Sequence, residues 1–136
     1  SQTDSFNADI KYGEDWELWL RMSESHQIGV LNSVQVGYLM RASSVTQTES
    51  LKLRNLQSIE TILQRYQNDN QRWNLPTSSF KIAKARILEG YADYYRGLQQ
   101  NRRAMSYSIR SLALAPQKRT LRHLLGDCKS FLMPAL

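Results

Sequence analysis

The helical spacing of apolar residues after Thr46 is the feature that most constrains the fold of this chain. From Thr46 onward, apolar side chains recur every three or four residues in successive stretches. We expect breaks between these stretches in the polar run Gln67–Gln71, at Pro76, at Gly97–Asn101 and at Pro116. The run Thr46-Gln47-Thr48-Glu49 has the form of a capping box, in which a Thr and a Glu three residues later satisfy free backbone donors. Each stretch has one apolar face and short connections. The sequence therefore predicts a mainly α fold, an antiparallel helical bundle.

The same spacing assigns the side chains that face the interior of this bundle. After Pro76, the predicted inward residues are Phe80, Ala83, Ile87, Tyr91, Tyr94 and Leu98. On the next helix they are Ala104, Tyr107, Ser108, Ser111, Leu112 and Ala115. On the last helix they are Leu121, Leu124, Leu125, Cys128, Phe131 and Leu132. The segment Tyr91–Pro116, with paired helices, an Ala-rich second helix and a closing Pro, weakly resembles a tetratricopeptide repeat.

Two short apolar runs before Thr46 differ from the helical region. His26–Leu31 and Val34–Met40 are rich in β-branched residues, and the turn formers Asn32 and Ser33 separate them. This pattern is typical of strands. We therefore expect a short two-strand β element near the N-terminus, whose strands pair with each other or with strands outside this sequence.

Charge is distributed unevenly along the chain. The net charge is +6, yet in residues 1–100 the 11 Lys or Arg balance the 11 Asp or Glu. Residues 101–136 hold one acid, Asp127, against seven cations, which are Arg102, Arg103, Arg110, Lys118, Arg119, Arg122 and Lys129. We expect these cations on the outer surface, where they meet an anionic neighbour or form a solvated face. Because they are not interleaved with exposed aromatic residues, we expect no nucleic-acid partner.

Composition limits the cellular compartment and the kinds of site that we expect for this chain. No apolar run approaches the roughly 18 residues of a membrane span, so the sequence predicts no transmembrane helix. The single Cys128 excludes an internal disulfide and a Cys-based metal cluster, and it fits a reducing, cytoplasmic setting. A helical protein- or membrane-docking module with a basic C-terminal end is one function that fits this composition.

The run Tyr12-Gly13-Glu14-Asp15-Trp16-Glu17-Leu18-Trp19-Leu20-Arg21 combines two adjacent carboxylates with two tryptophans. It predicts a helix from about Glu14 to Glu24, with Gly13 as the cap. Glu14 and Asp15 lie in its first turn, where negative charge meets the positive end of the helix dipole. Its apolar members recur at helical spacing and are typical of a core stripe, which is formed by Trp16, Trp19 and Leu20.

The same run, with two neighbouring features, resembles a known enzyme family. Phe6 precedes a charged loop, Glu14–Arg21 is similar to a helix start of the form ED-x-[DE]-L-x-x-R, and Gly37–Thr46 is similar to a segment of the form Tyr-Arg-x-His-x-x-Ser-x-Ser/Thr. These features resemble the C-terminal end of the catalytic domain in family 2 glycosyltransferases of the GT-A fold. The resemblance implies a boundary between this end, residues 1–45, and a helical C-terminal extension, residues 46–136.

The resemblance also implies roles for individual residues. Asp15 matches the family's general base, which takes the proton of the acceptor hydroxyl as that oxygen attacks the anomeric carbon. Glu14 would shape the acceptor pocket, and Trp16 would present a flat face to a sugar ring, whereas Trp19 is expected in the core. Arg41 stands where the family often has a metal-binding His. It cannot ligate a metal, so it either pairs with the donor's diphosphate oxygens or is a surface cation.

The nucleotide-sugar half of such an enzyme has no counterpart in this sequence. No Asp-x-Asp, no Gly-rich phosphate loop and no initiating Met occur. We therefore expect a C-terminal fragment, inactive alone, of an inverting glycosyltransferase of bacterial-type polysaccharide synthesis. The parent would move a sugar from a nucleotide-sugar donor to a glycan or lipid-linked acceptor, with Mg²⁺ or Mn²⁺ as cofactor. We expect it in the cytoplasm, peripheral to the inner face of the membrane through residues 101–136.

Overall fold

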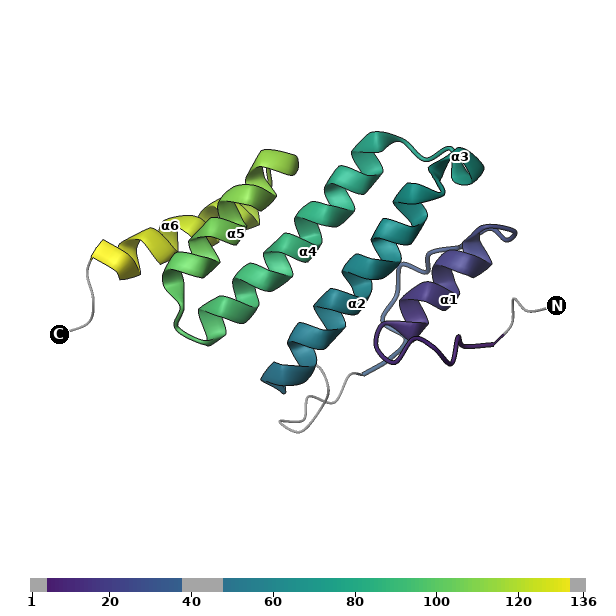
Figure 1. The fold of residues 1–136 in the computed structure, drawn as a ribbon, viewed down its shortest axis with the longest axis horizontal. Coiled ribbons are helices and arrows are strands. Elements are labelled where there is room, and N and C mark those ends of the chain that lie inside the picture. Colours follow the sequence, from purple (N-terminus) through teal and green to yellow (C-terminus); the bar gives the residue numbers. More distant parts are fainter. Residues whose placement is uncertain (1–4, 38–47, 133–136) are drawn as a thin grey trace. The chain divides into compact units, whose positions relative to one another are not determined.

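The computed structural model describes residues 5–37 and 48–132, and for residues 130–132 it describes the backbone alone (Figure 1). The described residues form the helices α1 (Glu14–Ser23), α2 (Glu49–Asn68), α3 (Asn70–Trp73), α4 (Thr77–Gly97), α5 (Asn101–Leu114) and α6 (Lys118–Leu132). The prediction of a mainly helical chain is confirmed, and so are the breaks at the polar run after α2, at Pro76, at residues 97–101 and at Pro116.

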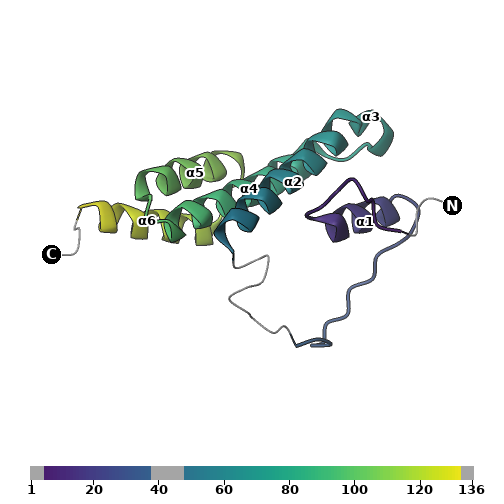
Figure 2. The same ribbon diagram turned by 60° about the horizontal axis from the view of Figure 1, so that its bottom comes forward.

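The chain divides into two compact units within α2, Ser1–Ile59 and Glu60–Leu136. The domain boundary predicted after residue 45 lies outside the described residues. In the second unit, α4 packs against α5, and α5 packs against α6. Figure 2 shows the same neighbours from a second direction. This succession of packed helices agrees with the predicted helical bundle.

Small residues let α4 and α5 approach closely. Ala85 and Ala104 are fully buried, and the Ser111 hydroxyl donates to the backbone oxygen of Ala85 at 2.9 Å. Larger apolar residues complete the core of this unit, which contains Ile62, Phe80, Ile87, Leu88, Tyr91 and Ala92. The inward stripe predicted for α4 is thus confirmed at Phe80, Ile87 and Tyr91.

Tyr91 ties α4 to the second half of α2. Its hydroxyl donates to Glu60 Oε2 at 3.0 Å, and its ring stacks on that of Tyr107 from α5 with centroids 5.2 Å apart. Burial raises the pKa of Tyr91 well above its usual range, and the Glu60 carboxylate raises it further. The raised pKa favours the neutral hydroxyl, which is the form that donates to Glu60.

The last helix is rotated relative to the prediction. Leu121 and Leu125, which were expected inside, are 49% and 63% exposed, whereas Thr120 and Asp127 are buried. Leu124 and Cys128 are half-buried, and the side chains of Phe131 and Leu132 lie outside the described residues. The inward stripe predicted for α6 is therefore wrong at Leu121 and Leu125.

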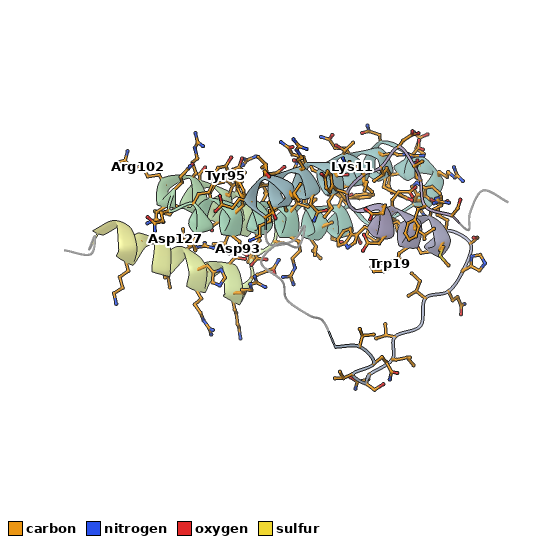
Figure 3. All side chains as sticks on the ribbon, turned by 90° about the horizontal axis from the view of Figure 1, so that it is seen from below. Lys11, Trp19, Asp93, Tyr95, Arg102 and Asp127 are labelled. Atoms are coloured by element: carbon orange, nitrogen blue, oxygen red, sulfur yellow. The ribbon has the colours of Figure 1, made fainter. Side chains whose placement is uncertain are left out.

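Hydrogen bonds between α4 and α6 explain this rotation. Arg96 donates from Nε and Nη2 to the two carboxylate oxygens of Asp127, both at 2.7 Å, and Thr120 donates to Glu89 Oε1 at 2.6 Å. Asp93 and Asp127 lie where α4 and α6 face each other (Figure 3). The bonds to Asp127 raise the pKa of Arg96 above its usual range. Burial of Asp127 and Thr120, with their hydrogen bonds to α4, therefore takes the place of burial of Leu121 and Leu125.

The predicted two-strand element is not seen. Residues 26–37 are described and contain no strand, and the end of the second run, residues 38–40, lies outside the described residues. Val30 and Val34 are 90% and 96% exposed. A strand needs a neighbour for its backbone donors and acceptors, and the described part of this chain offers no such neighbour to residues 26–37. The β-branched composition alone was therefore misleading.

Among residues 5–37 and 48–132, no helix has both the length and the apolar composition that crossing a membrane requires.

The contact between Arg96 and Asp127 predicts a measurable stability effect. Asp127→Asn keeps the shape of the side chain but removes the charge that both Arg96 donors meet. Breaking a buried ion pair costs several kcal/mol, but Arg96 is partly exposed and also donates to Asp93, so we expect a loss of about 2 kcal/mol. Urea unfolding should show this decrease in the free energy of unfolding. The exposed Asp69→Asn should change it by less than about 0.5 kcal/mol, and equal effects would contradict this assignment.

Candidate functional site

The start of α1 places the carboxylates that the sequence singled out. Gly13 is the N-cap residue with φ of 72°, a left-handed conformation that costs glycine little, and its carbonyl accepts the Glu17 amide at 3.0 Å. Glu14 and Asp15 follow in the first turn, as predicted. The Ser58 hydroxyl donates to the backbone oxygen of Tyr12 at 2.5 Å, which fixes the chain just before the helix to α2.

Glu17 and Arg21 hold α1 together, a role that the sequence reasoning missed. Glu17 is the buried residue of α1, and Arg21 donates to its two oxygens at 3.2 and 3.1 Å. Arg21 also donates to the backbone oxygen of Ser5 at 2.7 Å, so it connects the helix to the segment before it. The signal was present in the sequence, because a Glu four residues before an Arg is a favourable helical pair.

The arrangement leaves Asp15 available to solvent. Its side chain is exposed, and its Oδ1 accepts the Trp16 amide at 2.8 Å. Because Glu17 takes the structural role in the first turn, the Asp15 carboxylate is not needed to hold the helix. Its position at the positive end of the helix dipole favours negative charge.

The tryptophans of α1 do not form the predicted core stripe. Trp16 is 46% exposed and Trp19, labelled in Figure 3, is 56% exposed. The core placement expected for Trp19 is therefore wrong in the described structure, since Glu17 occupies the buried side of the helix instead. The exposed indoles of Trp16 and Trp19 thus share α1 with the exposed carboxylate of Asp15 and with the half-buried Glu14.

The exposed groups of α1 are suited to two kinds of interaction. An exposed carboxylate can accept a proton or a hydroxyl hydrogen bond, and an exposed indole can pack against the apolar face of a sugar ring. Arg41, the other predicted binding residue, lies outside the described residues. Within residues 5–37 and 48–132, no three His, Cys, Asp or Glu side chains gather as they would around a metal ion.

The basic C-terminal region is a second candidate surface. All seven of its cations are exposed, as predicted, but several also make contacts within the unit. Arg119 pairs with Asp93 at 3.2 Å, while Arg103 and Arg110 lie over the rings of Tyr95 and Tyr107 at 5.4 and 5.2 Å. Exposure alone therefore does not identify the cations that are available to a partner.

No family model, no curated protein and no solved structure matches this chain.

The Glu17–Arg21 pair predicts a local effect on α1. Glu17→Ala removes the two oxygens to which Arg21 donates on this helix, at a cost of about 1–3 kcal/mol. We expect the amides of Glu14–Ser23 to exchange with solvent hydrogen about tenfold faster or more, as measured by mass spectrometry. Met22→Ala, at an exposed position of the same helix, should leave this exchange nearly unchanged. Equal exchange in the two variants would show that Glu17 does not hold the helix.

Proposed function

We propose that residues 1–45 form the acceptor side of an inverting glycosyltransferase, with Asp15 as its general base. The observation that carries this proposal is the exposed Asp15 carboxylate in the first turn of α1, directly beside the exposed Trp16. The neighbouring Glu17 holds the helix, so Asp15 is free of that structural role. The resemblance of Glu14–Arg21 to the family 2 helix start supports the same role.

The proposed reaction is a single displacement. The Asp15 carboxylate accepts the proton of an acceptor hydroxyl while the hydroxyl oxygen forms a bond to the anomeric carbon of the donor sugar. The bond from that carbon to the nucleotide diphosphate breaks, and the diphosphate leaves with the electron pair. Attack from the opposite side inverts the anomeric centre. A sugar hydroxyl is a weak nucleophile, so removing its proton during attack is the contribution required of Asp15.

Neighbouring residues would position the acceptor. Glu14 lies in the same turn and would accept a second sugar hydroxyl, and the exposed ring of Trp16 would pack against a sugar face. Arg41 would pair with the diphosphate oxygens of the donor. The Mg²⁺ or Mn²⁺ expected for such an enzyme is proposed as a cofactor of the parent enzyme.

Substitution of Asp15 tests this proposal in the full-length protein. Asp15→Asn keeps the size of the side chain but cannot accept the proton, so release of nucleoside diphosphate from nucleotide-sugar donors should fall about 100-fold or more. Binding of the donor, measured by calorimetry, should change little. Asp69→Asn, another exposed aspartate, is the matched control and should keep full activity. Full activity of Asp15→Asn would refute the assignment.

A second candidate function concerns residues 46–136. We propose that they form a helical docking module, weakly similar to a tetratricopeptide repeat, whose basic end holds the parent enzyme at the cytoplasmic face of the membrane. The observation in its favour is the exposure of all seven cations of residues 101–136, while the single acid of this region, Asp127, is buried against Arg96. The exposed Lys, Arg, Asp and Glu side chains of residues 101–129 are therefore all cationic, as docking to anionic lipid head groups requires.

A further inference from the structure

One stripe of α6 combines exposed cations with exposed leucines. Lys118, Leu121, Arg122, Leu125 and Lys129 follow one another at intervals of three, one, three and four residues, so they share one side of the helix. All five are exposed. We call this set the outer stripe of α6. Side chains of α6 project away from α4 and α5 on this side of the unit (Figure 3).

The opposite side of α6 fixes the outer stripe in this orientation. Thr120 and Asp127 are buried, and their bonds to Glu89 and Arg96 span 2.6–2.7 Å. Turning the leucines inward would break these bonds and expel Asp127 from its pair with Arg96. Exposure of the leucines is therefore built into the packing of the helix, at the cost of leaving apolar surface in water.

The charge of the outer stripe is of one sign. Asp127 is the single acid of residues 101–136, and it lies on the buried side of α6. Arg119, although exposed, faces Asp93 and Glu89 on α4 and is partly neutralised there. The stripe thus presents three cations around two leucines, over about three helical turns.

We propose that the outer stripe of α6 docks on an anionic lipid surface, which specifies the docking function proposed above. Leu121 and Leu125 enter the boundary between head groups and acyl chains, and the three cations reach lipid phosphates with their long side chains. Cations that interleave with leucines suit head groups better than the continuous apolar groove of a protein partner, in which they would be desolvated. Charge complementarity therefore selects the lipid surface.

Two variants of the chain test the stripe by co-sedimentation with vesicles. The probe is a vesicle of phosphatidylcholine and phosphatidylglycerol, compared with phosphatidylcholine alone. Each cation near an anionic leaflet contributes about fivefold to binding, so replacing Lys118, Arg122 and Lys129 with Gln should weaken it about 100-fold. Replacing Leu121 and Leu125 with Gln should weaken it about tenfold or more, and this loss should persist at raised salt, which screens the cations.

Matched variants on other helices control for net charge and apolarity. The charge control replaces the exposed Arg65, Lys81 and Lys84 with Gln, and the apolar control replaces the similarly exposed Ile82 and Ile109 with Gln. Both should bind acidic vesicles as the unaltered chain does, apart from a small effect of net charge. Circular dichroism should show that every variant unfolds at the temperature of the unaltered chain, since all of these positions are exposed.

A fluorescent label reports the orientation directly. Cys128 is the single cysteine, so Leu125→Cys and Ile82→Cys can each be labelled specifically in a Cys128→Ser background. Lipids that carry a quencher in the acyl chain should quench the label at position 125 and leave the label at position 82 unquenched. Equal quenching, or equal vesicle binding by stripe and control variants, would overturn the stripe proposal while leaving membrane docking in place. Failure of the unaltered chain to bind acidic vesicles would overturn both.

Discussion

The paired hydrogen bonds between Arg96 and Asp127 determine how the C-terminal helices are oriented. Both bonds span 2.7 Å, and Asp127 is buried, so the carboxylate depends on Arg96 for compensation. Thr120 also donates to Glu89, and Arg119 pairs with Asp93, so α6 contacts α4 through polar groups along about two turns. The apolar contacts of α4 and α5 provide the core, but these polar contacts decide which side of α6 meets solvent. The side chains that the basic end presents to a partner therefore depend on these polar contacts.

Hydrophobic periodicity predicted where the helices lie but not how the last one is rotated. The breaks at Pro76 and Pro116 and the buried Phe80, Ile87 and Tyr91 follow from rules that act along the chain. The burial of Asp127 depends on Arg96, 31 residues away, and no local pattern in the sequence indicates that pairing. The strand prediction for residues 26–37 was wrong for a related reason, because a strand is stable only when another strand pairs with its backbone hydrogen-bonding groups.

At the candidate site on α1, too, the features set by neighbouring residues were predictable and those set by distant contacts were not. The positions of Gly13, Glu14 and Asp15 at the helix start were predictable, since caps and first-turn acids are local features. The burial of Glu17 and the exposure of Trp16 and Trp19 were not, because burial depends on contacts between residues far apart in the sequence, such as the bond from Arg21 to the Ser5 backbone oxygen. Arg41 lies outside the described residues, so its role stays a prediction. The role of Asp15 as a base likewise stays a proposal.

At both candidate surfaces, one buried acid of the helix makes the ion pair that holds the helix in place. On α1, Glu17 binds Arg21, and the carboxylate of Asp15 is left in solvent beside exposed indoles. On α6, Asp127 binds Arg96, and cations and leucines are left outside. In each case a charged pair with several hydrogen bonds fixes the rotation of a helix more strongly than its own apolar side chains do. Apolar side chains left in water in this way are costly, and the sugar proposed at α1 and the lipid surface proposed at α6 would each cover them.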